Sequence, residues 1–177
     1  MMTSDIPNDS SNPRKHIDLR NLLTRAEGPG RACWLDLSPA PGIYVVRWLM
    51  SESPVFLTDA GQAVYAATKS PYFLRSKWES INKNSSTDII YIGKGNILRK
   101  RISILVRFGV GRSRKHQGGE WMWQILNIAS CELVTQACPL GKQVGFENSL
   151  LERFIKEHGD VPLANRGRTR GPDRWMP

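Results

Sequence analysis

Two short apolar segments, each with a tyrosine inside it, constrain the fold of this chain most strongly. Residues 41–46 read Pro-Gly-Ile-Tyr-Val-Val, and residues 88–93 read Asp-Ile-Ile-Tyr-Ile-Gly. Short runs rich in β-branched and aromatic residues are typical of buried strands. Pro39 and Pro41 disfavour a helix before the first run. We therefore predict strands from about residue 42 to 49 and from 88 to 92, with the rest of the domain built around them.

Helix and strand signals alternate on both sides of these two strands. Apolar residues at helical spacing predict an amphipathic helix over residues 16–27, ended by the Gly28-Pro29-Gly30 sequence, in which His16 is a solvated residue at the helix start. Asn96 is a favourable N-cap residue for a helix over 97–108 that Gly109 would close. Further signals predict helices over 120–128 and 146–158 and a strand over 131–137. His158, just before the capping Gly159, is expected to interact with the helix dipole.

A long segment separates the two tyrosine-containing strands. Residues 54–58 and 62–67 have strand character on either side of an Asp-Ala-Gly turn signal, and residues 70–81 suit a short helix before a polar loop over 82–87. We predict a β-rich insert at about 50–87. The predicted division of the chain is a disordered tail (1–15), an N-terminal helix and lead-in (16–40), one α+β domain (41–167) and a basic C-terminal tail (168–177).

Charge is the most informative feature of the composition. The 177 residues carry a formal net charge of +9, and eight Lys or Arg but no Asp or Glu lie between Tyr91 and Gly119. Clustered positive charge favours a polyanionic partner such as DNA, although a merely basic protein is the alternative. Three cysteines without a C-x-x-C pair argue against a disulfide framework or a zinc site. The chain has no signal peptide and no apolar run of about 20 residues, which predicts a cytoplasmic protein with no membrane partner.

Five motifs occur in an order that resembles the GIY-YIG nuclease family. They are Gly42-Ile43-Tyr44, Tyr91-Ile92-Gly93, Arg101, Glu152 within Leu-Glu-x-x-Ile, and Asn165 within Pro-x-x-Asn. The resemblance covers about residues 41–167. It implies a small three-stranded mixed sheet flanked by helices, with the insert between the first two strands. It also implies metal-dependent cleavage of nucleic-acid phosphodiesters.

The resemblance assigns a role to each motif residue. Glu152, which helical spacing puts on the flank of the apolar stripe of helix 146–158, would bind Mg²⁺ or Mn²⁺. Arg101 would contact the scissile phosphate, Tyr44 would activate water and Tyr91 would position it. Asn165 would anchor the end of the last helix by hydrogen bonds. His116 would shuttle a proton; the alternative is a solvated loop residue. The residues predicted to contact DNA are Lys94, Arg99, Lys100, Arg112, Arg114, Lys115, Arg166 and Arg168.

Three functional hypotheses remain open at this point. The first is a metal-dependent endonuclease that hydrolyses DNA. The second is a catalytically inactive nucleic-acid-binding module of the same fold. The third is a basic interaction domain in which the tripeptides are coincidental. Restriction, repair, mobile-element and toxin nucleases share this kind of domain, so the resemblance implies no single biological role. Sequence specificity would come from the insert or from a homodimer, because no separate recognition domain is apparent.

Overall fold

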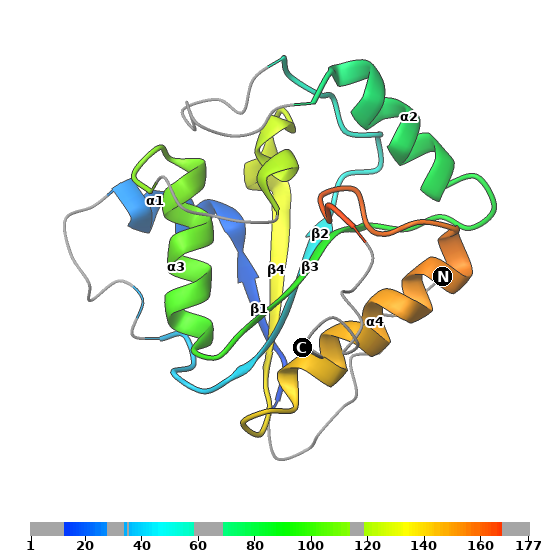
Figure 1. Ribbon diagram of the computed structural model, residues 1–177. Coiled ribbons are helices and arrows are strands. Elements are labelled where there is room, and N and C mark those ends of the chain that lie inside the picture. The colour runs from blue at the N-terminus through cyan, green and yellow to red at the C-terminus, as the bar shows by residue number, and fades with distance from the viewer. Residues whose placement is uncertain (1–12, 28–33, 35, 59–68, 114–118, 168–177) are drawn as a thin grey trace, which may run out of the picture.

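The computed structural model describes residues 13–27, 34, 36–58, 69–113 and 119–167, which form an α+β fold. One antiparallel sheet has the strand order β1 (Lys15–Asp18), β4 (Cys131–Ala137), β2 (Gly42–Trp48) and β3 (Ile89–Gly95). Four α-helices and two 3-10 helices complete the described part of the chain: α1 (Leu19–Glu27), α2 (Pro71–Ile81), α3 (Leu98–Gly109), α4 (Gln143–His158), η2 (Glu120–Gln124) and η3 (Ile128–Ser130). Helices α1 and α3 lie on one side of the sheet and α4 on the other (Figure 1).

The two tyrosine-containing segments form strands, as the sequence predicted, and in the structure these strands pair with each other. Strand β2 is central and pairs with β3 on one side and β4 on the other, so that Tyr44 lies opposite both Gly93 and Thr135. Every residue of β2 except Arg47 is buried. Strand β3 continues to Gly95, beyond the predicted end at residue 92. The apolar character of both strands thus reflects their position between two helical layers.

The expected three-stranded mixed sheet is wrong in two respects. The sheet has four strands, and all of them are antiparallel. The added strand is β1, which covers the edge of β4 with Ile17 opposite Leu133. The predicted helix over 16–27 is therefore shorter, and His16 lies in β1 with its Nδ1 3.0 Å from the Glu132 carboxylate. The Asp18 carboxylate accepts a hydrogen bond from the Arg20 amide at 2.8 Å, which helps α1 to begin at Leu19.

The insert contains less strand structure than its sequence indicated. Among its described residues, only Phe56 forms an isolated bridge, with Ile125, and α2 matches the predicted helix. The predicted strand over 62–67 lies outside the described residues. Two parts of the insert, at Leu57 and at Lys69, are joined by the buried side chain of Gln124. This side chain accepts a hydrogen bond from the Lys69 amide at 2.9 Å and donates one to the Leu57 carbonyl at 3.0 Å.

Three helix predictions needed correction. The segment 120–128 forms η2 and then η3 instead of one α-helix, and Asn127 between them has a left-handed backbone with φ of 62°. Asn96 does not cap α3, because Ile97 occupies that position and the Asn96 side chain accepts a hydrogen bond from Gln143. His158 is buried, and its Nδ1 donates to the Ile81 carbonyl at 2.8 Å, whereas the sequence predicted a helix-dipole residue.

Candidate active site

Tyr44 and Tyr91 lie on the same face of the sheet because of the strand register. Tyr44 is opposite Gly93, and Tyr91 is two residues before Gly93 on β3, so all three share the side that faces α3. The two rings have centroids 5.8 Å apart and planes inclined at 55°. A Cβ at position 93 would lie 2.6 Å from Tyr44 Cζ and 2.9 Å from Tyr91 Cε1. Glycine is therefore required at position 93 for the two tyrosines to pack in this way.

Arg101 joins the tyrosines from the first turns of α3. A Cβ at Gly95 would lie 2.8 Å from Arg101 Cβ, so this glycine lets the helix approach the end of β3. The Arg101 guanidinium opposes the burial that otherwise raises the pKa of both tyrosines. Three residues that are distant in sequence are thus electrostatically coupled: Tyr44, Tyr91 and Arg101.

Tyr44 is fully buried, and its environment keeps the phenol protonated. Burial raises the pKa of Tyr44 well above its usual value, and the neighbouring Tyr91 raises it further. Among the described residues, the Tyr44 hydroxyl has no hydrogen-bond partner of good geometry, although Tyr91 and Arg101 are close enough to influence its ionisation. A buried hydroxyl without a partner is costly. A neutral phenol can orient another group, but it does not act as a base at neutral pH.

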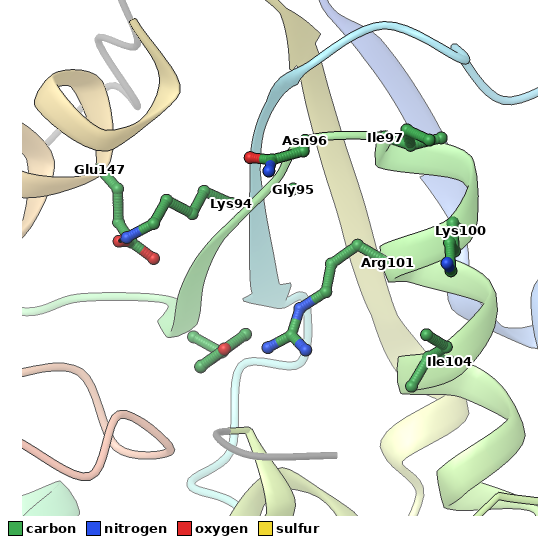
Figure 2. A pocket seen from close by; sticks show the side chains of 9 residues that line it. Lys94, Gly95, Asn96, Ile97, Lys100, Arg101, Ile104 and Glu147 are labelled. Atoms are coloured by element: carbon green, nitrogen blue, oxygen red, sulfur yellow. Dashed lines mark hydrogen bonds and ion pairs between the residues drawn. The ribbon is translucent and has the colours of Figure 1, made fainter. Parts of the chain in front are cut away.

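A cavity of about 530 Å³ opens beside this cluster at the end of β3. Arg101 extends into it from α3, while Lys94 of β3 and Glu147 of α4 point toward one another on one side of it (Figure 2). The residues that line it are Tyr91, Lys94, Gly95, Asn96, Ile97, Lys100, Arg101, Ile104 and Glu147. Tyr44 is not part of the wall and lies behind Tyr91 and Arg101. Three cations and one carboxylate therefore face a common space that can accept an anionic group.

Glu147, and not Glu152, is the carboxylate at this cavity. Glu147 is mostly buried, forms an ion pair with Lys94 and raises the pKa of Tyr91. Glu152 is exposed on α4. Five residues along a helix correspond to a rotation of about 140° from Glu147, so Glu152 faces a different direction. The structure thus does not bring Glu152 together with Tyr91 and Arg101.

The position of Glu147 follows from where α4 begins. The helix was predicted to start at residue 146, but α4 begins at Gln143. The Gln143 amide donates to Asn96 at 2.8 Å, which holds the N-terminus of α4 against the connection between β3 and α3. Glu147, one turn after Gln143, consequently lies over the end of β3. In the sequence, the indication for Glu147 as a site residue is its place one turn into a helix that packs on the Gly-Lys-Gly segment.

Asn165 was predicted to anchor the end of the last helix, and in the structure its side chain bonds to the edge of the sheet. Its side chain accepts a hydrogen bond from the Ile92 amide at 3.0 Å and donates to the Ile92 carbonyl at 2.9 Å. The Ala164 amide also donates to the Ile90 carbonyl at 2.9 Å. The segment after α4 therefore satisfies the outer backbone groups of β3, next to Tyr91. Asn165 positions the strand that carries Tyr91 and does not line the cavity.

The predicted DNA-contacting residues fall into three groups. Lys94 and Lys100 line the cavity. The others that are described bind the protein itself: Arg99 donates to the Leu37 carbonyl at 3.1 Å, Arg112 donates to the Ala26 carbonyl at 2.9 Å, and Arg166 forms an ion pair with largely buried Glu120. The third group, Arg114, Lys115 and Arg168, lies outside the described part of the chain, as does His116, the predicted proton shuttle.

The donor set at the cavity is compatible with a hard cation that keeps most of its waters. In the described ranges, no group of three or more His, Cys, Asp or Glu side chains is close enough to form a metal site. Glu147 is the only acidic residue among those that line the cavity. Mg²⁺ is commonly bound by one or two carboxylates together with water and substrate phosphates, so a single carboxylate is sufficient for it.

Comparisons with known proteins assign no family to the chain. No protein-family model, curated protein or solved structure matches it. In the part of the chain that the structure describes, no helix combines the length and apolar composition needed to cross a membrane.

Proposed function

We propose that this protein is a metal-dependent endonuclease that hydrolyses DNA phosphodiester bonds at the cavity between β3, α3 and α4. The observation that supports the proposal is the composition of the cavity wall. Arg101, Lys94 and Lys100 supply positive charge, Tyr91 supplies a phenol and Glu147 supplies a carboxylate. These groups suit an anionic substrate whose charge increases as a nucleophile approaches phosphorus.

Each residue has a role that follows from its position. Arg101 binds the scissile phosphate with its planar array of donors, and Lys100 binds a flanking phosphate. Tyr91 holds the attacking water by a hydrogen bond, while Tyr44 behind it orients Tyr91 and Arg101. Water adds to phosphorus, one P–O bond breaks, and the leaving oxygen gains a proton as the water loses one. Glu147 would hold Mg²⁺ or Mn²⁺, which would supply charge neutralisation and a more acidic bound water.

A second candidate function is binding without turnover. It is favoured by one observation, the ion pair between Glu147 and Lys94, because a carboxylate neutralised by lysine is a weaker metal ligand. In this case the cavity would bind a phosphate without hydrolysing it. The endonuclease function requires Lys94 to release Glu147 and to pair with the substrate phosphate instead, so that Glu147 can bind the metal. The binding function does not require this exchange.

Cleavage of supercoiled plasmid in Mg²⁺ and in EDTA tests the proposal, with Arg101→Ala beside wild type. Arg107→Ala is the matched control, because Arg107 is an exposed arginine on the same helix that does not line the cavity. We expect cutting by wild type in Mg²⁺ and none in EDTA. Arg101→Ala should lose at least about 100-fold in rate, as is typical when a donor to developing negative charge is removed, and Arg107→Ala should retain near wild-type activity.

Two other outcomes would change the conclusion. If folded wild-type protein binds DNA but cuts neither single-stranded, double-stranded nor branched substrates in Mg²⁺ or Mn²⁺, the binding module is correct. If Arg101→Ala and Arg107→Ala reduce cleavage equally, general charge attraction explains the effect and the cavity is not the active site.

A further inference from the structure

A cluster of aromatic rings and lysines lies on the insert, outside the cavity. The N-terminal half of α2 presents Tyr72, which is 81% exposed, and Phe73, which is 40% exposed. The Phe73 ring packs edge-on against Trp121 of η2, with centroids 5.6 Å apart and planes at 80°. The Lys69 ammonium lies 5.4 Å from the Phe73 ring and 5.6 Å from the Trp121 ring. The partly exposed Phe73 ring is therefore held against the buried Trp121 ring beside a cation.

Basic residues predominate around these rings, and the acidic residue of α2 is Glu79, one turn after Arg75. Residues 69–78 contain Lys69, Arg75 and Lys77 but no Asp or Glu. Arg75 is exposed and lies three residues after Tyr72, so the two side chains are neighbours on the helix surface. Exposed aromatic residues next to exposed cations are the combination that binds single-stranded nucleic acid, since bases stack on the rings and phosphates contact the cations.

The cluster is connected to the wall of the cavity through a few residues. A Cβ at Gly119 would lie 3.3 Å from the Tyr91 ring, and Trp121 follows two residues later, at most about 7.6 Å along the backbone. Lys77 donates to the carbonyls of Pro162 and Asn165, both at 3.1 Å, which joins α2 to the segment bound to β3. Its ammonium also lies 5.3 Å from the Trp121 ring. These contacts hold the aromatic cluster at a fixed position relative to Tyr91.

We propose that Tyr72 and Phe73 of α2 stack on unpaired bases of a nucleic-acid strand, while Lys69 and Arg75 hold its phosphates. Bases inside a duplex are covered on both faces, so exposed rings of this kind favour single-stranded segments, frayed ends or branched substrates. The inference rests on the proposed function, because it takes nucleic acid as the substrate and adds that the substrate has an unpaired segment. Binding can nevertheless be measured without any cleavage.

Fluorescence anisotropy in EDTA tests the inference, with a labelled oligothymidine and a labelled duplex of the same length. Removal of one stacking ring typically weakens binding by about 5- to 150-fold. We expect Tyr72→Ala and Tyr72→Leu to raise the Kd for the single strand within this range, and Tyr72→Trp to remain close to wild type. Leu140→Ala is the control, because Leu140 is similarly exposed at 79% and lies in the turn before α4. Circular dichroism checks that each variant is folded.

Each possible result has a defined meaning. An unchanged single-strand Kd in Tyr72→Ala, or an equal change in Leu140→Ala, would overturn the inference. Retention of affinity in Tyr72→Leu would show that the surface needs apolar area and not a ring, which fits a protein partner. A lower mass by light scattering for Tyr72→Ala than for wild type would identify the surface as an interface between two copies of the chain. If single-strand binding depends on Tyr72 but the protein cleaves no DNA substrate, this inference is supported and the proposed endonuclease function is wrong.

Discussion

Replacement of Gly93 by alanine tests the packing that creates the site. Three contacts decide the outcome: the added Cβ would lie 2.6 Å from Tyr44 Cζ, 2.7 Å from Tyr44 Oη and 2.9 Å from Tyr91 Cε1. Ordinary carbon contacts begin near about 3.5 Å, so a ring must move by several tenths of an ångström or more. Tyr44 is fully buried between the sheet and α3, which leaves it no open space into which it can shift.

We expect Gly93→Ala to lower the free energy of unfolding by about 1–3 kcal/mol, the usual cost of overpacking a core. Alanine also restricts the unfolded chain, which offsets about 0.4–1 kcal/mol of this loss. For a chain of this size, a net loss of about 1.3 kcal/mol corresponds to a fall in Tm of about 3–5 °C. Calorimetry or urea unfolding gives the value directly.

Gly145→Ala is the control for the same chemical change. Nothing lies within 4 Å of a Cβ at position 145, and the residue is exposed in α4. Alanine there should stabilise the protein by about 0.5–1 kcal/mol through helix propensity. The double variant Gly93→Ala with Tyr44→Phe should recover only part of the loss, because Cζ remains. The account of the site is refuted if Gly93→Ala is as stable as Gly145→Ala.

Two further predictions concern the sheet edge and the pH dependence of stability. Asn165→Ala leaves both backbone groups of buried Ile92 without partners and should lower the free energy of unfolding in urea by about 2–4 kcal/mol. Asn148, on a partly exposed turn of α4, is the control, and Asn148→Ala should lower it by less than about 0.5 kcal/mol. Equal losses would contradict the anchoring role. Burial raises the pKa of Cys131 from 9.0 to about 12. The unfolded chain therefore loses the thiol proton at a lower pH than the folded protein does. The stability that the buried neutral thiol contributes is fully present below about pH 9 and is lost between about pH 9 and pH 12. By about pH 10, the free energy of unfolding of wild type should have fallen by about 1.4 kcal/mol more than that of Cys131→Ala. If the unfolding free energies of the two proteins change in parallel with pH, the raised pKa of Cys131 is refuted.

The sequence predicted the elements whose pattern is set by burial. The β-branched runs at Ile43 and Ile90 are covered on both faces in the structure, and the apolar stripe that contains Leu151 and Phe154 packs on the sheet. These segments could be recognised because local propensity and tertiary environment agree. Tyr44, Tyr91 and Glu152 lie on these elements, but the motif residues were named from the resemblance and not from the burial pattern.

The missed features depend on tertiary contacts. Strand β1 forms because β4 has an edge to pair with, which helical periodicity in residues 16–27 does not reveal. Phe56 bridges Ile125 across the fold and does not form a local hairpin. Glu147 lies at the cavity because α4 packs on β3, where the Gln143–Asn96 hydrogen bond and the Lys94–Glu147 ion pair join the two elements. Both Glu147 and Glu152 lie inside the predicted helix, so the way α4 packs on β3 decides which carboxylate faces the cavity.

Mg²⁺-dependent plasmid cleavage by Glu147→Ala beside Glu152→Ala tests the central claim most directly. Both substitutions remove a carboxylate from α4, but only Glu147 lines the cavity with Tyr91 and Arg101. We predict that Glu147→Ala abolishes cleavage while DNA binding persists, and that Glu152→Ala cuts at close to the wild-type rate. Loss of cleavage in Glu152→Ala with full activity in Glu147→Ala would contradict the assignment of the active site to this cavity.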